Sequence, residues 1–141
     1  MIERKNYLDR IKPFIDKDII KVLTGIRRCG KSVMLKLIKE ELIKNGRSKE
    51  QFITLNFENL KNKPYCTAQT LNDYIIERAK PNQKNYIFLD EIQEVEEWEK
   101  CINSLRADED YDFDIYITGS NAKLLSGELA TYLAGRYVEF M

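Results

Sequence analysis

Histidine is absent from this sequence of 141 residues, and its absence rules out zinc sites and every catalytic triad that needs an imidazole. Cysteine is scarce, since Cys29, Cys66 and Cys101 form an odd, widely spaced set without a CxxC pair. An excess of charge of one sign is also missing, because 23 basic residues balance 23 acidic ones. This zero net charge argues against a protein whose main role is to coat nucleic acid or an anionic membrane.

Long hydrophobic runs are missing as well. No stretch reaches the roughly 18 apolar residues that a membrane-spanning helix needs. The first residues, Met1 to Lys5, are followed by polar residues rather than by the apolar core of a signal peptide. We therefore expect a soluble, cytoplasmic protein with no membrane partner. The length fits one domain over residues 1–141, large enough to bury a core without disulfide or metal staples.

Short apolar runs alternate with amphipathic stretches along the chain. The runs predict strands over residues 19–24, 52–57, 86–89, 113–118 and 137–140. The stretches predict helices over residues 6–14, 31–44, 70–79, 95–105 and from about 121, and Gly46 stands where a helix C-cap glycine belongs. This alternation is typical of an α/β fold in which helices cover both faces of a parallel sheet. Ligands of such sheets bind beyond the carboxyl ends of the strands.

A glycine-rich loop directly follows the first expected strand and directly opens the next helix. Residues 25–32 read GIRRCGKS and match the P-loop (Walker A) pattern, GxxxxGK followed by Ser or Thr. Glycines at both ends let the backbone N–H groups turn inward as an anion nest, and the helix N-terminus adds positive potential. Lys31 can then reach the β- and γ-phosphates of a nucleotide, and the Ser32 hydroxyl can bind Mg²⁺. The predicted nucleotide-binding set is Gly25, Ile26, Arg27, Arg28, Cys29, Gly30, Lys31, Ser32 and Val33.

The simpler interpretation of this loop is a chance glycine turn before a helix. Such a match is expected only about once in a few hundred random chains of this size, and the strand and helix around the loop make chance rarer still. The side chains of Arg27 and Arg28 are expected to point outward, toward acidic neighbours or a partner.

A pair of carboxylates ends the third expected strand, since the apolar run from Tyr86 to Leu89 continues into Asp90 and Glu91. This is a Walker B pattern, for which the simpler alternative is a charged loop. Asp90 is expected to hold the Mg²⁺ shell through water and Ser32. Glu91 is expected to orient or deprotonate the attacking water. Guanine specificity is not expected, because the chain has neither DxxG at this point nor an NKxD motif.

Polar residues also follow the fourth expected strand, where Thr118 runs into Gly119, Ser120 and Asn121. If this strand lies between the P-loop strand and the Walker B strand, Ser120 can contact the γ-phosphate or the nucleophilic water. The alternative role for Ser120 and Asn121 is to cap the next helix.

The order of these motifs resembles that of AAA+ ATPases of the additional-strand P-loop class. The residues LTGIRRCGKS at 23–32, FLDEIQ at 88–93, TGSN at 118–121 and LAGRY at 133–137 are most similar to prokaryotic AAA domain family 14. The resemblance covers nearly the whole chain from Arg4 onward. It implies a three-layer P-loop NTPase fold with the sheet order 5-1-4-3-2, ATP and Mg²⁺ as ligands, and Glu91 as the hydrolytic carboxylate.

The resemblance also implies roles for two further residues. Arg136 falls where such proteins place an arginine that can act on the nucleotide of a neighbouring subunit, which implies a homo-oligomer. Asn56, late in the second expected strand, is a candidate to pair with Glu91 as a switch. Surface or structural roles are the alternatives for both residues.

Proteins of this family continue past the fifth strand into a helical lid and further domains, whereas this sequence stops at Met141. We therefore expect an ATP-binding core without lid, left by truncation, a split gene or decay, and weakly active alone. Its expected function is ATP hydrolysis coupled to movement of a protein or DNA client, or of the missing domains. The alternatives are a non-hydrolysing ATP-binding interaction module and, less favoured by the Asp90-Glu91 pair, a small-molecule P-loop kinase.

Overall fold

The computed structural model describes residues 8–24, 28–120 and 137–140. Of the residues singled out above, Gly25, Ile26, Arg27, Asn121 and Arg136 lie outside this part of the chain, as do the side chains of Arg28 and Cys29. In the described part, no helix combines the length and the apolar character that crossing a bilayer requires.

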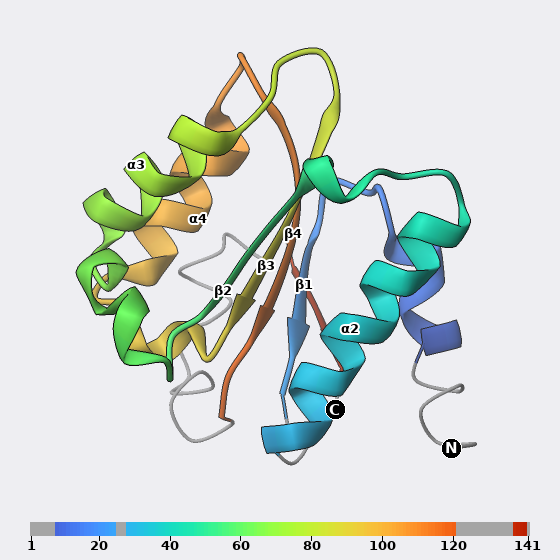
Figure 1. Ribbon diagram of the computed structural model, residues 1–141, viewed down its shortest axis with the longest axis horizontal. Helices are drawn as coiled ribbons and strands as arrows, with labels where there is room; N and C mark the ends of the chain where they lie inside the picture. Colours follow the sequence, from blue (N-terminus) through green and yellow to red (C-terminus); the bar gives the residue numbers. More distant parts are fainter. Residues whose placement is uncertain (1–7, 25–27, 121–136, 141) are drawn as a thin grey trace.

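A five-stranded, fully parallel sheet forms the centre of the molecule (Figure 1). Its spatial order is β2-β3-β4-β1-β5, which confirms the expected order 5-1-4-3-2. The order places β4 between the strand before the P-loop and the strand that ends in the two carboxylates. The strands are β1 (Ile20–Leu23), β2 (Phe52–Asn56), β3 (Lys84–Asp90), β4 (Asp112–Thr118) and β5 (Tyr137–Phe140).

Helices cover both faces of the sheet, as the sequence predicts (Figure 1). Helix α2 (Arg28–Lys44) lies on one face, and α3 (Ala68–Arg78) and α4 (Trp98–Ala107) lie side by side on the other. Short 3-10 turns occupy the connections: η1 (Lys12–Phe14), η2 (Lys49–Gln51), η3 (Leu60–Tyr65) and η4 (Ile92–Glu94). The result is the three-layer α/β sandwich expected from the resemblance.

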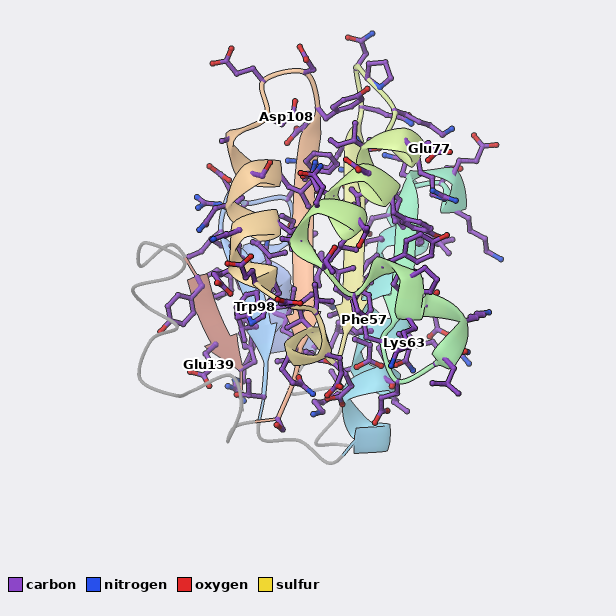
Figure 2. All side chains as sticks on the ribbon, turned by 90° about the vertical axis from the view of Figure 1, so that its left-hand side faces the viewer. Phe57, Lys63, Glu77, Trp98, Asp108 and Glu139 are labelled. Atoms are coloured by element: carbon purple, nitrogen blue, oxygen red, sulfur yellow. The ribbon has the colours of Figure 1, made fainter. Side chains whose placement is uncertain are left out.

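Alternating side chains of each strand supply two separate cores. On β3, Ile87 and Leu89 pack toward α3 and α4, whereas Tyr86 and Phe88 pack toward α2. Figure 2 looks onto the α3 and α4 side and shows Trp98 at the start of α4 and Phe57 just past β2, both part of the first core. Because both faces are covered, the central strands need apolar residues at nearly every position.

Local sequence signals set two of the helix ends. Helix α2 ends at Lys44, and just past it Gly46, with φ of 93°, lets Arg47 N–H donate to Leu42 O at 2.9 Å, a Schellman arrangement. Helix α3 begins with a capping box between Thr67 and Thr70. Both features follow directly from residue type.

The expected helix over 95–105 begins three residues later, at Trp98, so its predicted start was wrong. Glu96 N–H donates to Cys66 O at 2.8 Å, and residues 67 and 96 form a parallel bridge. This long-range pairing holds Glu96 extended, and Glu97 then takes a left-handed conformation with φ of 55° before the helix can start. The apolar spacing of the segment contains no sign of that bridge.

A buried ion pair joins β1, the strand that precedes the P-loop, to its neighbour β4. Lys21 on β1 donates to Asp114 on β4 and to Lys17 O at 2.8 Å, with both charged side chains fully buried. Asp114 also accepts from Tyr116 Oη at 2.7 Å and from Asp16 N–H at 2.9 Å. Burial lowers the pKa of Lys21, and the charge of Asp114 opposes that shift.

We expect Lys21→Met to lower the free energy of unfolding by about 3–5 kcal/mol, because it leaves the Asp114 carboxylate buried without its counter-charge. Urea denaturation followed by circular dichroism measures this change. The matched control is Lys100→Met, which removes an exposed pair with Glu97 and should cost less than about 1 kcal/mol. Equal losses at the two positions would contradict the importance given to the buried pair.

Candidate active site

The carboxyl edge of the sheet brings the two predicted motifs together. Helix α2 begins just beyond β1, and Asp90 ends β3 at the same edge (Figure 1). Between them lies β4, which ends at Thr118. Side chains from α2, β3 and β4 therefore meet at one point, although they are up to 87 residues apart in sequence, as between Lys31 and Thr118.

Asp90 is the centre of the first group of contacts. Ser32 Oγ donates to Asp90 Oδ2 at 2.6 Å, and Thr118 Oγ1 donates to Asp90 Oδ1. The Asp90 side chain is buried, so these hydroxyl groups replace the water that a carboxylate needs. The sequence anticipates the Ser32–Asp90 pair, but it does not single out Thr118.

Glu91 is the centre of the second group. Its Oε2 lies 3.2 Å from Lys31 Nζ, with only 5% of the lysine and 6% of the glutamate side chain exposed. Its Oε1 accepts from Gln93 Nε2 at 2.8 Å, and its backbone N–H donates to Thr118 Oγ1 at 3.0 Å. Lys31 and Gln93 thus hold the Glu91 carboxylate, while Thr118 holds the Glu91 backbone.

The backbone at Glu91 explains why its side chain reaches Lys31. Tyr86 and Phe88 face α2, so Asp90 faces α2 as well, and a residue that continued the strand at 91 would face the other side. Glu91 instead adopts a left-handed conformation, with φ of 60° and ψ of 54°. Such a conformation costs of order 1–3 kcal/mol for a residue with a Cβ, and here it accompanies the turn of the carboxylate toward α2.

The remaining predicted site residues differ in their outcome. Gly30 and Val33 lie in the first turns of α2, next to Lys31 and Ser32. Ser120 follows β4 by two residues, but in the described part of the chain the β4 residue that contacts both carboxylate residues is Thr118. The expected pairing of Asn56 with Glu91 is not formed in this structure, where the Glu91 carboxylate contacts Lys31 and Gln93 and Asn56 Oδ1 accepts from Glu58 N–H at 3.0 Å.

Sequence reasoning missed two residues that touch the carboxylates. Thr118 is the last residue of an apolar strand, where a threonine is usual and carries no signal of its own. Gln93 lies in η4, two residues after Glu91, and a glutamine at that position carries no signal of its own. Only the turn at Glu91 and η4 brings its amide back to the carboxylate.

The donor set fits Mg²⁺ bound together with a nucleotide. A hydroxyl and a carboxylate, Ser32 Oγ and Asp90 Oδ2, are hard oxygen ligands of the kind that Mg²⁺ prefers. The described residues contain no cluster of three or more Asp, Glu, Cys or His side chains that could hold a metal ion. Mg²⁺ in such sites usually completes its octahedral shell with water and phosphate oxygens, so two protein groups suffice.

The sheet order and the position of the two motifs define a P-loop NTPase fold. The chain belongs to the AAA domain family, because the profile of AAA domain family 14 matches residues 17–141. This match and the fold confirm the resemblance on which the expected strand order was based.

Two curated relatives share much of this sequence. An uncharacterized protein of Haemophilus influenzae is 48% identical over 140 residues, which cover 99% of this chain and 34% of that protein. The uncharacterized protein MJ1544 of Methanocaldococcus jannaschii is 42% identical over 118 residues, covering 83% of this chain and 24% of that protein. The chain thus spans about a third or less of the length of these relatives.

Two solved structures share the fold of this chain. The P-loop NTPase domain of the sigma-54 transport activator from E. coli aligns with a TM-score of 0.56 at 15% identity, over 97% of this chain and 93% of that chain. A chain in the structure of Drosophila ORC bound to AT-rich DNA and Cdc6 aligns with a TM-score of 0.57 at 12% identity, over 99% of this chain and 54% of that chain. At these identities the likeness concerns the fold.

Proposed function

We propose that this domain binds ATP with Mg²⁺ and hydrolyses it to ADP and phosphate. One observation carries the proposal: Ser32 contacts Asp90 while Lys31 contacts Glu91, so that the P-loop pair and the Walker B pair meet side by side. A chance glycine turn and an unrelated charged loop would have no reason to meet in two matched contacts.

The role of each residue follows from its contacts. Lys31 supplies a positive charge at the start of α2, where the helix N-terminus also attracts phosphate. Ser32 and Asp90 would hold Mg²⁺, which when bound neutralises charge on the phosphates. Glu91, whose Oε2 lies 3.2 Å from Lys31 Nζ, is the carboxylate available to orient water for attack on the γ-phosphate. Thr118 fixes the relative position of the two acids by bonding to both residues.

Several finer parts of the proposal come from the sequence. ATP is favoured over GTP because the motifs that read guanine are missing. Ser120 is proposed to sense the γ-phosphate, and Arg136 is proposed to act on the nucleotide of a second copy in an oligomer. Because the chain spans only part of its relatives, hydrolysis is proposed to move other domains or a protein or DNA client. The cytoplasm, where ATP is abundant, is the proposed location.

Phosphate release tests the proposal directly. We expect the chain to release phosphate from MgATP, to do so more slowly from MgGTP, and to stop when EDTA removes Mg²⁺. A phosphate-sensing fluorescence assay over a range of protein concentrations measures all three and also reveals the dependence on oligomerisation. Binding of MgATP without phosphate release would instead favour a non-hydrolysing interaction module. Transfer of phosphate to a small molecule would favour a kinase.

A further inference from the structure

Gln93 is the residue near the site to which the proposed function assigns no role. It lies in η4, two residues after Glu91. Its Nε2 donates to Glu91 Oε1 at 2.8 Å, whereas its contact with Glu94 Oε2 is longer, at 3.5 Å. The main partner of this amide is therefore the carboxylate proposed to orient water.

The orientation of the Gln93 amide is set by Glu91. An ionised carboxylate can only accept hydrogen bonds, so the NH₂ group must face it. The amide oxygen, Gln93 Oε1, is then left buried without a hydrogen-bond partner in the described part of the chain. Leaving a buried acceptor unpaired costs free energy. The hydrogen bond from Gln93 Nε2 to Glu91 must therefore stabilise the structure by more than the unpaired Gln93 Oε1 destabilises it.

We expect binding of nucleotide to change which side chains hold the Glu91 carboxylate. In this structure the Glu91 carboxylate is shared between Lys31, at 3.2 Å, and Gln93, at 2.8 Å. Lys31 is also the cation that the proposed function assigns to the phosphates. When Lys31 turns toward the phosphates, Gln93 is the remaining side chain of the described residues that donates to this carboxylate, since Thr118 contacts only the Glu91 backbone.

We propose that Gln93 is a positioning residue that keeps the Glu91 carboxylate oriented toward the attacking water after Lys31 has moved to the phosphates. This inference rests on the proposed function. It assigns Gln93 no contact with the nucleotide, so Gln93 should affect the rate of hydrolysis and leave nucleotide affinity unchanged. Orientation of a general base within hydrogen-bond reach is part of its catalytic effect.

The test compares Gln93→Met and Gln93→Glu with the wild-type chain. Both replacements keep the length of the side chain and remove the N–H donor. We expect kcat for phosphate release to fall about tenfold in each, with the Kd of the uncharged variant Gln93→Met for MgATP within about twofold of wild type. The control is Gln69→Met, which removes an exposed glutamine that donates to Asp73 on α3 and should change neither value.

A second measurement separates positioning from a general structural role. In a Glu91→Gln background there is no carboxylate to hold, so Gln93→Met should cause no further fall in single-turnover rate. Wild-type kcat in Gln93→Met, or an equal further fall in the Glu91→Gln background, would overturn the inference and leave the proposed function intact. A wild-type chain that binds MgATP but releases no phosphate would overturn both.

Discussion

Replacing Lys31 with alanine is expected to weaken MgATP binding by about 2–5 kcal/mol, the usual cost of removing one partner from a buried, charge-assisted contact. Lys31 is 4% exposed and lies in the first turn of α2, where its charge adds to that of the helix N-terminus. The lower end of this range corresponds to about a 30-fold rise in Kd. Isothermal titration with MgATP measures it.

Lys31→Ala has a second effect that the experiment must separate from the first. The change leaves the Glu91 carboxylate buried without its cation, which lowers stability in the absence of any ligand. The double variant Lys31→Met with Glu91→Gln removes both charges and should recover most of that stability without recovering affinity. The control is Lys36→Ala, because Lys36 is exposed on the same helix. If Lys31→Ala bound MgATP as tightly as Lys36→Ala, the P-loop assignment would be wrong.

Replacing Glu91 with glutamine is expected to slow phosphate release by about 10²–10⁴-fold, the usual contribution of a general base. Glutamine keeps the shape of the side chain and one acceptor oxygen but cannot take a proton from water. Phosphate release at saturating MgATP measures the effect. The control Glu77→Gln changes an exposed acid on α3, far from the carboxyl edge of the sheet (Figure 2).

Nucleotide affinity in Glu91→Gln should remain equal to that of the wild type or become higher. In the structure Lys31 is paired with Glu91, so phosphate must compete with this carboxylate for the lysine. Removing the negative charge removes that competition. A variant that lost binding and hydrolysis together would contradict the assignment of Glu91 to the hydrolytic step. A variant with the wild-type rate of release would contradict the Walker B interpretation itself.

The Ser32–Asp90 contact can be predicted from the sequence, whereas the Lys31–Glu91 contact cannot. A hydroxyl directly after the P-loop lysine and an aspartate at the end of an apolar strand are expected to meet, because both motifs lie at the carboxyl edge of a parallel sheet. The Lys31–Glu91 contact depends on the left-handed backbone at Glu91. Positive φ at a non-glycine residue has no sequence signal, so this contact could not be predicted.

Two further predictions differ from the structure because of polar contacts that the sequence does not signal. The start of α4 at Trp98 depends on a hydrogen bond from Glu96 to Cys66, thirty residues earlier in the chain. The amide oxygen of Asn56 caps a local turn, and the Glu91 carboxylate contacts Lys31 and Gln93 in place of Asn56. Hydrophobic spacing reports which face of an element is buried, but it does not report which distant residue satisfies a given polar group.

The sequence by itself determined the α/β class, the parallel sheet covered on both faces and the location of the P-loop and Walker B residues, because strand and helix periods and short motifs are local properties. The strand order came from the family resemblance and not from the periods. Only the tertiary structure decided that Thr118 bonds to both acids and that Glu91 turns back to Lys31 and Gln93. These contacts join residues from separate elements, and packing of the whole sheet is what brings them within hydrogen-bond distance.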